Sequence, residues 1–298
     1  MLKNSVFIFI KCEKCYKIVY IIKTLPREEA KMNFTIHDQH IHSSFSFDSD
    51  EDMENYIKEA VKKNNCYFIT TEHYELNSFK GNLVIDFKGL KQRLAALALK
   101  YPITPLLGIE LGYKPEITAL IEAVTRSHDF DLVLLSIHSD KNGSFFQPAQ
   151  YKRLGVKQVL TNYFSLMLSA INDYDNFDCL AHFDYALRNA HLDNDFNYQD
   201  YLDQIKAVFK ALIRCDKALE INLKVQSEIN DETYLKTVLK LYYDLGGRKI
   251  MISSDSHNLE SYKKRFLTDF PKYQRLLKEI GFEALTYYVK RKAIEFPI

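Results

Sequence analysis

The chain has 298 residues, of which 47% are hydrophobic and 27% are charged, and this composition excludes a disordered or low-complexity chain. With 40 basic and 39 acidic side chains the formal net charge is +1, which argues against a main role in binding nucleic acid or an anionic membrane. Neither G-x-G-x-x-G nor G-x-x-x-x-G-K-[ST] occurs, so we expect no glycine-rich phosphate loop. Five scattered cysteines do not form a disulfide framework, and we expect a cytoplasmic protein.

Residues 1–31 hold two short apolar runs on either side of a basic segment. Neither run approaches the roughly 18 residues that span a membrane, and the small-residue cleavage site of a signal peptide is missing. Cys12 and Cys15 form a C-x-x-C without the second pair that a zinc site needs. We predict that residues 1–31 are an N-terminal extension, with Met32 as a candidate start, and that residues 32–298 form one barrel domain.

After Met32 the chain repeats one unit seven times: a short β-rich run ends in His, Asp, Glu or Asn, and a segment with helical spacing usually follows. The apolar positions of residues 51–63 and 231–245 recur with the helical period. We expect Ser49 to cap the first of these helices, and Gly246 with Gly247 to end the second. The seven predicted strands are residues 34–42, 66–73, 103–110, 131–138, 179–184, 218–222 and 249–257.

Strands that alternate with helices predict a parallel sheet with right-handed crossovers. Seven units over about 250 residues favour a closed, TIM-like (β/α)7 barrel over an open sheet, with the active site at the C-terminal ends of the strands. The polar residues lie at those ends. Because side chains alternate along a strand, Asp38, His40 and His42 should share one face. The same period pairs Thr71 with His73, Ser136 with His138, His182 with Asp184, Glu220 with Asn222, and Asp255 with His257.

These side chains predict a metal site. Two imidazoles of an H-x-H lie about 6–7 Å apart at Cα, so both can reach one divalent ion. Imidazole and carboxylate without thiolate favour Zn, Mn or Fe, and the number of ligands implies two or three divalent ions. Such sites activate a water molecule and stabilise the charge that develops on a phosphoryl group.

The ordered motifs resemble those of the PHP (polymerase and histidinol phosphatase) superfamily, over a span from Asp38 to at least His257. Within it the chain most resembles the stand-alone histidinol-phosphate phosphatases. This resemblance implies a distorted seven-stranded barrel and a trinuclear metal centre. The motifs are D-x-H-x-H at 38–42, T-E-H at 71–73, G-I-E at 108–110, S-I-H at 136–138, A-H-F-D at 181–184, E-I-N at 220–222 and S-D-S-H at 254–257.

The resemblance also implies which residues hold each ion. One ion would be bound by His40, His42, Glu110 and Asp255. A second would be bound by Glu110, His138 and His182, with Glu110 as the bridge. The third would be bound by Asp48, His73 and His257.

Four further residues are candidates for substrate binding or catalysis. Arg188 follows His182 by six residues and could grip a phosphate bidentately. Asp184 is predicted either to donate a proton to the leaving group or to orient a ligand. Asn222 is predicted to orient ligands or substrate, and Lys224 to add a phosphate contact.

We therefore expect a metal-dependent phosphomonoester hydrolase with a small phosphate-ester substrate and no nucleic-acid or membrane partner. The resemblance favours L-histidinol phosphate, hydrolysed to L-histidinol and phosphate in histidine biosynthesis. A PHP-type enzyme for a nucleotide, sugar phosphate or phosphoprotein is the alternative. A metal-dependent amidohydrolase is disfavoured because its fourth strand usually precedes a carbamylated lysine, whereas here that strand ends in His138. A non-enzymatic module is disfavoured by the complete ligand set.

Overall fold

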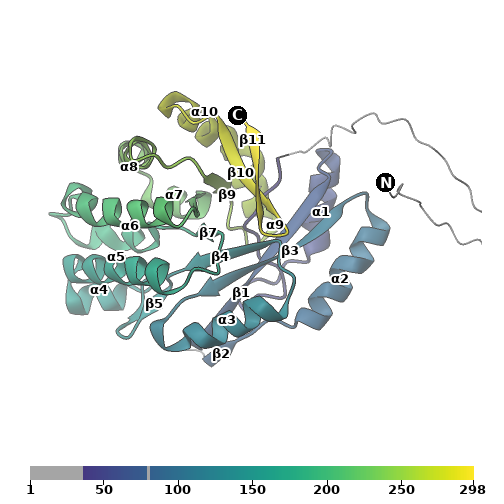
Figure 1. Cartoon of the computed structure of the whole chain (residues 1–298), viewed down its shortest axis with the longest axis horizontal. Coiled ribbons are helices and arrows are strands. Elements are labelled where there is room, and N and C mark those ends of the chain that lie inside the picture. The colour runs from purple at the N-terminus through teal and green to yellow at the C-terminus, as the bar shows by residue number, and fades with distance from the viewer. Residues whose placement is uncertain (1–35, 79–80) are drawn as a thin grey trace, which may run out of the picture. The chain divides into compact units, whose positions relative to one another are not determined.

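The main sheet has seven strands in the order β2–β1–β3–β4–β7–β8–β9 (Figure 1). It is seen in a computed structural model that describes residues 36–78 and 81–298. Six of the strands run parallel to one another, and β2 pairs antiparallel with the end of β1. The strands are β1 (Tyr67–Ser78), β2 (Gly81–Leu83), β3 (Thr104–Gly112), β4 (Leu132–Ser136), β7 (Cys179–Leu180), β8 (Ala218–Asn222) and β9 (Ile250–Ser253).

The six parallel strands all lie within or overlap six of the predicted runs, so the predicted parallel α/β sheet is confirmed. The first predicted strand differs. Its residues 34 and 35 lie outside the described residues, and the remainder forms only one β-bridge, from Ile41 to Ser256. Side-chain oxygens there replace the backbone hydrogen bonds of a regular strand. Asp38 Oδ1 accepts from His40 N at 3.3 Å, and Thr71 Oγ1 accepts from Ile41 N at 3.0 Å.

Residues 41 and 42 nevertheless lie between β1 and β9. Thr71 N, in β1, donates to Ile41 O at 2.9 Å. His42 N donates to Ser256 O, just beyond β9, also at 2.9 Å. This short segment therefore holds its two histidines beside the C-terminal ends of both strands.

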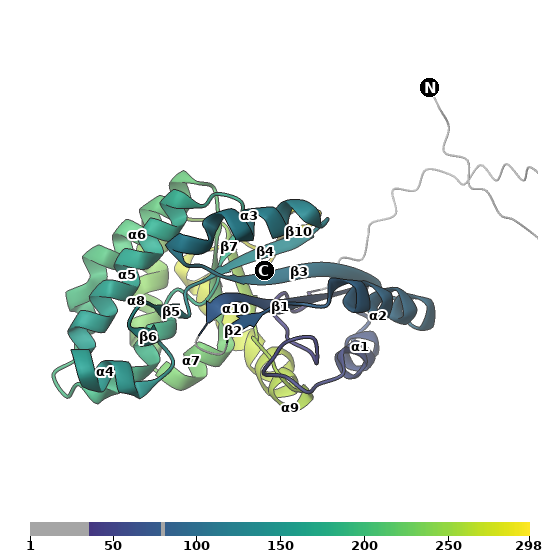
Figure 2. The ribbon, with the colours of Figure 1, turned by 90° about the horizontal axis from the view of Figure 1, so that it is seen from below.

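Helices follow most of the strands and lie on the outside of the sheet (Figures 1 and 2). In the later half of the fold, α5 contacts α6, α6 contacts α8, and α8 contacts α10. The α-helices are α1 (Met53–Lys62), α2 (Phe87–Lys100), α3 (Thr118–Ser127), α4 (Pro148–Leu154), α5 (Val156–Asp173), α6 (Leu202–Arg214), α7 (Leu223–Ile229), α8 (Glu232–Asp244), α9 (Leu259–Tyr262) and α10 (Phe270–Ile280). Three short 3-10 helices, η1 (Pro115–Ile117), η2 (Tyr185–Leu192) and η3 (Tyr198–Tyr201), and one π-helix, η4 (Lys263–Asp269), complete the helical segments.

Both predicted helices are present, but one predicted cap is wrong. The first helix is capped by Asp52, whose side chain accepts from Glu54 N, and not by Ser49. Ser49 Oγ instead donates to His257 O at 2.8 Å, so this hydroxyl ties the loop to the segment after β9. The second helix, α8, ends as predicted before Gly246, which has a φ of +97°.

The inner face of the sheet changes from apolar to polar along the strands. Near the N-terminal ends the inward side chains form one buried core cluster: Ile69, Leu106, Leu132, Leu134, Cys179, Ala181, Ala218, Met251 and Tyr288. Tyr288 comes from the hairpin of β10 (Ala284–Val289) and β11 (Lys292–Pro297), and β10 contacts β9. Two or four residues further along the same strands, the inward positions hold His73, Glu110, Ser136 and Glu220. The apolar core therefore fills one end of the inner face and the polar residues fill the other.

The remaining expectations concern the N-terminal extension, the cysteines and membrane spanning. The predicted extension, with Cys12 and Cys15, lies outside the described residues, so its boundary stays a prediction. In the described ranges Cys66, Cys179 and Cys215 are free thiols. A small two-stranded turn, β5 (Ser139–Asp140) with β6 (Gly143–Ser144), follows β4. No helix in the described part of the chain is long and apolar enough to cross a membrane.

Candidate metal centre

Nine predicted ligands come from the C-terminal ends of different strands and from two adjoining segments. His73 is on β1 and Glu110 on β3. His138 and His182 lie just beyond β4 and β7, and Asp255 with His257 lies just beyond β9. His40 and His42 come from the segment between β1 and β9, and Asp48 from the loop before α1. The structure brings all nine together.

Glu110 lies at the centre of this cluster and has no exposed surface. Its Oε2 lies 3.3 Å from His40 Nε2, 3.4 Å from His42 Nε2 and 2.7 Å from His73 Nδ1. Its Oε1 lies 2.8 Å from His182 Nε2 and 3.2 Å from His138 Nε2. One carboxylate thus faces two groups of imidazoles, with one oxygen toward each.

The other two carboxylates extend the cluster. Asp255 Oδ1 lies 3.4 Å from His42 Nε2, which joins it to the group of His40 and Glu110. Asp48 Oδ2 lies 3.5 Å from His73 Nε2 and 3.3 Å from His257 Nε2. The side chain of Asp48 is 35% exposed and that of Asp255 is 4% exposed, so Asp48 forms the solvent side of the cluster.

A second layer of carboxylates lies behind the imidazole rings. His40 Nδ1 is 2.7 Å from Glu220 Oε1, and His138 Nδ1 is 2.5 Å from Glu75 Oε1. His42 Nδ1 is 3.1 Å from Ser46 Oγ, which donates to Glu72 Oε2. An acceptor behind the ring fixes the ring and makes the opposite nitrogen a better ligand, an arrangement that is typical of metal-binding histidines.

The electrostatics of the cluster are those of charges packed together out of water. Burial opposes protonation of His40, but the carboxylates of Glu220 and Glu110 outweigh it and hold the His40 pKa well above its usual value. Burial also lowers the pKa of His42, and the neighbouring His73 and His257 lower it further. For Glu110 burial raises the pKa, but the surrounding His73, His40 and His138 hold it well below the usual range. A carboxylate anion is therefore favoured at the centre.

The donor set fits divalent ions. Three groups have ligand atoms that all lie within 4.8 Å of one another: His42, His73 and His257; His40, His42 and Glu110; and His73, Glu110 and His138. Glu110 Oε2, His73 Nδ1 and His257 Nε2 are buried without an aligned hydrogen bond. Buried polar atoms of this kind are costly unless something binds them, and cations bound within the cluster would reduce that cost.

Asp184 does not share the face of His182. The strand β7 ends at Leu180, His182 has a φ of +27°, and the chain then turns, so the two-residue period does not reach Asp184. Asp184 Oδ2 accepts from Gln226 Nε2 at 2.6 Å and from Tyr234 OH at 3.5 Å. Burial raises the pKa of Asp184 to about 7. Both of these partners lie outside the set of nine predicted ligands.

Arg188 lies beside the cluster, on η2. Its guanidinium carbon is 3.9 Å from the centre of the Tyr185 ring, and that ring lies 4.9 Å from His182 and 5.1 Å from His138 between centroids. Arg188 Nε is 3.1 Å from Glu228 Oε2, while Nη2 is buried without a hydrogen bond. The guanidinium is therefore held against the Tyr185 ring, next to the ligands, with the N–H groups of Nη2 still available to donate.

Asn222 and Lys224 lie at the start of α7. Asn222 Oδ1 caps this helix by accepting from Val225 N, and its Nδ2 donates to Glu220 Oε2 and Asp255 Oδ2. Its amide is thus already used to hold two carboxylates. Lys224 Nζ is 3.3 Å from Asp255 Oδ1 and 3.4 Å from His257 Nδ1, at the edge of the cluster.

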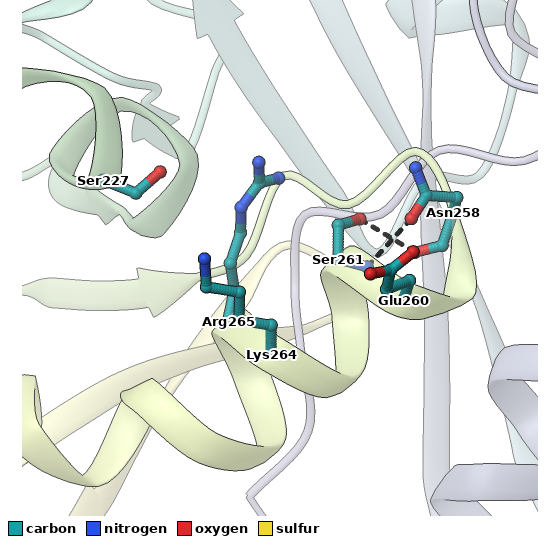
Figure 3. A pocket seen from close by; sticks show the side chains of 6 residues that line it. All are labelled: Ser227, Asn258, Glu260, Ser261, Lys264 and Arg265. Carbon is teal, nitrogen blue, oxygen red and sulfur yellow. Dashed lines mark hydrogen bonds between the residues drawn. The ribbon is translucent and has the colours of Figure 1, made fainter.

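A pocket of about 250 Å³ lies next to this edge, between α7 and the segment of α9 and η4 (Figure 3). One of its lining residues is Asn258, which directly follows His257 in the chain. Arg265 Nη1 donates to Asp255 O at 3.3 Å, which links the pocket to the ligand segment. The residues that line it are Ser227, Asn258, Glu260, Ser261, Lys264 and Arg265.

Sequence reasoning did not single out Glu75 and Tyr185. Glu75 could have been found, because β1 continues to Ser78 and the two-residue period places Glu75 on the face of His73. Tyr185 has no such signal, because it lies on a 3-10 turn. The other three histidines lie apart from the cluster: His37 contacts Tyr287 with its ring tilted, His128 contacts Phe87, and His191 Nδ1 lies near Arg188 O.

The family model described as "PHP domain" matches residues 38–224, which is more than half of the chain. The chain belongs to the PHP domain family. The match covers every ligand segment described above except the one that carries Asp255 and His257.

Curated relatives extend the similarity over most of the chain. A Clostridium acetobutylicum protein named "Probable histidinol-phosphatase" is 34% identical over 234 residues, which are 78% of this chain and 90% of the relative. A Lactococcus lactis protein named "Histidinol-phosphatase" is 26% identical over 84% of this chain and 93% of its own length. The crystal structure of histidinol phosphate phosphatase from Lactococcus lactis, complexed with Zn, L-histidinol and phosphate, has a TM-score of 0.78 at 24% identity. It covers 86% of this chain and 98% of the neighbour, so the two share a fold.

Proposed function

We propose that this PHP domain protein is a metal-dependent phosphomonoester hydrolase that converts L-histidinol phosphate and water to L-histidinol and phosphate. The observation that carries the reaction class is the arrangement of imidazoles around the two oxygens of Glu110. The observation that favours this substrate is the similarity to relatives named histidinol-phosphatase over about four fifths of the chain.

We assign three ions to the centre, each Zn, Mn or Fe. The first would be held by His40, His42, Glu110 and Asp255, the second by Glu110, His138 and His182, and the third by Asp48, His73 and His257. The distances between these side chains support each set. When bound, such ions supply a nucleophilic water and positive charge at the phosphoryl group.

The chain's own residues position and neutralise the substrate. Arg188 would donate its spare N–H groups to phosphoryl oxygens, because Tyr185 and Glu228 already fix the plane of the guanidinium. Lys224 would add a positive charge at the Asp255 edge. Asn222 would hold Asp255 in place and contact the substrate only through it. Asp184 stays a predicted catalytic residue, and its contacts with Gln226 and Tyr234 favour the positioning alternative.

We also propose that the barrel is closed. The hydrogen bonds that join Ile41 to β1 and His42 to the end of β9 support this, because they bridge the two sides that an open sheet would leave apart. Closure would explain how residues from both sides reach one centre.

The test is phosphate release from L-histidinol phosphate by protein reconstituted with Zn, Mn or Fe, beside a panel of nucleotides, sugar phosphates and phosphopeptides. We expect L-histidinol phosphate to have the highest kcat/KM and His138→Ala to lose at least about 100-fold, since it removes a proposed ligand. The matched control is His128→Ala, because His128 packs against Phe87, away from the cluster. A higher kcat/KM for another ester class would replace the substrate and keep the reaction class. Near-normal turnover by His138→Ala would contradict the multi-ion centre.

A further inference from the structure

Two exposed aromatic rings lie at the rim of the metal centre. The large hydrophobic side chains that stand exposed in the described part of the chain are Phe47, Val84, Leu99, Leu120, Phe146 and Leu192, and two of them are aromatic. Phe47 is 45% exposed, and its ring centroid lies 5.3 Å from that of His73. Phe146 is 55% exposed, and the guanidinium carbon of Arg188 lies 5.2 Å from its ring centroid. Both rings thus adjoin a residue that is assigned to the reaction.

The two rings terminate one continuous series of ring contacts across the centre. His73 and His138 have ring centroids 5.4 Å apart, and His138 and Tyr185 have theirs 5.1 Å apart. Phe47 adjoins the first of these rings, and Arg188 connects the last to Phe146. The histidines at the proposed phosphate site are therefore linked to one exposed ring through His73 and to the other through Tyr185 and Arg188.

Hydrogen bonds hold the backbone segments that carry both rings. Phe146 N donates to Ser144 Oγ at 3.2 Å, and its carbonyl oxygen accepts from Asn189 Nδ2 at 3.0 Å. Phe47 lies between Ser46, whose hydroxyl bonds to Glu72 and accepts from His73 N, and Asp48 of the cluster. A backbone segment that is fixed in advance loses little further entropy when a ligand stacks on its ring, and a Phe ring has only two side-chain torsions to order.

We propose that Phe47 and Phe146 form a leaving-group subsite that selects a phosphate ester carrying a flat, unsaturated or cationic ring. This inference rests on the proposed function, in which the leaving group carries an imidazole and an ammonium group. Aromatic faces attract another ring by offset stacking and a cation by its charge. The imidazole of the substrate is only a few bonds from its phosphate, so it would reach a ring that adjoins Arg188 or His73.

The test compares L-histidinol phosphate with 2-aminoethyl phosphate, which carries an ammonium group but no ring. The measured quantity is the ratio of the two kcat/KM values in the zinc-loaded enzyme. We expect at least one of Phe47→Ala and Phe146→Ala to lower this ratio about fivefold, and the double variant to lower it at least about tenfold, since stacking and cation–π contacts have this size. The loss should appear in KM for L-histidinol phosphate, because binding of the leaving group is uniform through the reaction.

Three controls separate this role from a structural one. Phe→Tyr variants should keep the ratio and Phe→Leu variants should lower it, since Leu fills space without an aromatic face. Leu99→Ala, at a side chain that is 92% exposed on α2, should leave the ratio unchanged. Calorimetry of L-histidinol with the zinc-loaded protein gives a readout without turnover, and the double variant should bind it at least about tenfold more weakly.

The failure of this subsite and the failure of the proposed function are distinguishable. If the wild type hydrolyses L-histidinol phosphate and the double variant keeps both the ratio and the affinity for L-histidinol, the subsite is wrong and the function stands. If the wild type hydrolyses p-nitrophenyl phosphate but not L-histidinol phosphate, the function is wrong. The same ratio, taken with p-nitrophenyl phosphate, then decides the subsite.

Discussion

Glu110 has both carboxylate oxygens turned toward imidazole nitrogens and no surface in contact with water. Glu110→Gln keeps the size of the side chain but replaces one oxygen by an N–H donor that cannot bind a cation. We expect metal content to fall and kcat/KM to drop by more than the roughly 100-fold that loss of an outer partner can cost. Elemental analysis beside kinetics would measure both, and Glu116→Gln, at an exposed position on η1, is the matched control. Full metal occupancy in Glu110→Gln would contradict the bridging role.

Removal of a carboxylate behind one histidine should cause a partial loss of metal binding. Glu75 contacts His138 Nδ1 but none of the other predicted ligands, so its removal should weaken one ion and spare the others. We expect Glu75→Gln to reduce the affinity of the ion proposed at His138 by about 10–100-fold, since such partners orient the ring and raise its basicity. Metal titration with a competing chelator would resolve it. Equal weakening of every bound ion would show that Glu75 acts on the fold and not on His138.

At the scale of elements, substitutions at two glycines of β3 should have different effects. One should disturb the metal centre, and the other should disturb the packing of β3 against β1. A Cβ added at Gly112 would overlap both carboxylate oxygens of Glu75, which are the far end of a flexible side chain. A Cβ added at Gly108 would lie 2.8 Å from Thr70 O, which is backbone of β1. The first change can be relieved by moving a side chain, and the second only by moving a strand.

We therefore expect Gly112→Ala to act like Glu75→Gln, with a loss of metal affinity of about 10–100-fold and a nearly unchanged melting temperature. Gly108→Ala should lower the free energy of unfolding by about 1–3 kcal/mol, the usual cost of overpacking a core. Urea denaturation and metal titration of both variants measure the difference. Normal metal affinity in Gly112→Ala would mean that Glu75 has a second position from which it can hold His138.

The strands also show which parts of the fold and the site could be predicted from the sequence. The polar ends of the strands predicted the cluster because the two-residue period holds wherever a strand continues, as it does from Thr71 to His73 on β1. The period failed between His182 and Asp184 because β7 ends at Leu180 and the chain turns. The first predicted strand is a single bridge because side chains of Asp38 and Thr71 take its backbone groups. Sequence alone does not show where side chains replace the backbone hydrogen bonds between strands.

For the whole molecule, the inner face of the sheet places an apolar core at one end and a set of buried charges at the other. The core provides hydrophobic stabilisation, whereas like charges and unpaired polar atoms in the cluster oppose folding until cations bind. Bound ions that do not bind the unfolded chain should therefore stabilise the fold by mass action. The stability of this protein should thus depend on metal, and the dependence should vary with pH.

The direction of that variation follows from His138. Burial opposes its protonation, but the carboxylates of Glu75 and Glu110 outweigh it and raise the His138 pKa to about 9. In the metal-free native state His138 thus keeps its proton up to about pH 9. In the unfolded chain, where its pKa is about 6.5, His138 releases this proton at a lower pH. The stability that this proton contributes is complete below about pH 6.5 and is lost as the pH rises toward 9.

If His138 binds an ion as proposed, the same imidazole has no such proton to lose in the metal-loaded protein, since a ligand must be deprotonated. We therefore expect the melting temperature to fall more steeply from pH 7 to pH 9 in the metal-free protein than in the metal-loaded one. The gap between the two should widen by at least about 3 °C, the shift that roughly 1 kcal/mol gives a domain of this size. Thermal melts with chelator and with excess zinc at both pH values measure the gap. Glu75→Gln removes one cause of the raised pKa and should reduce the widening, while parallel curves for the two wild-type forms would show that no proton is held at His138.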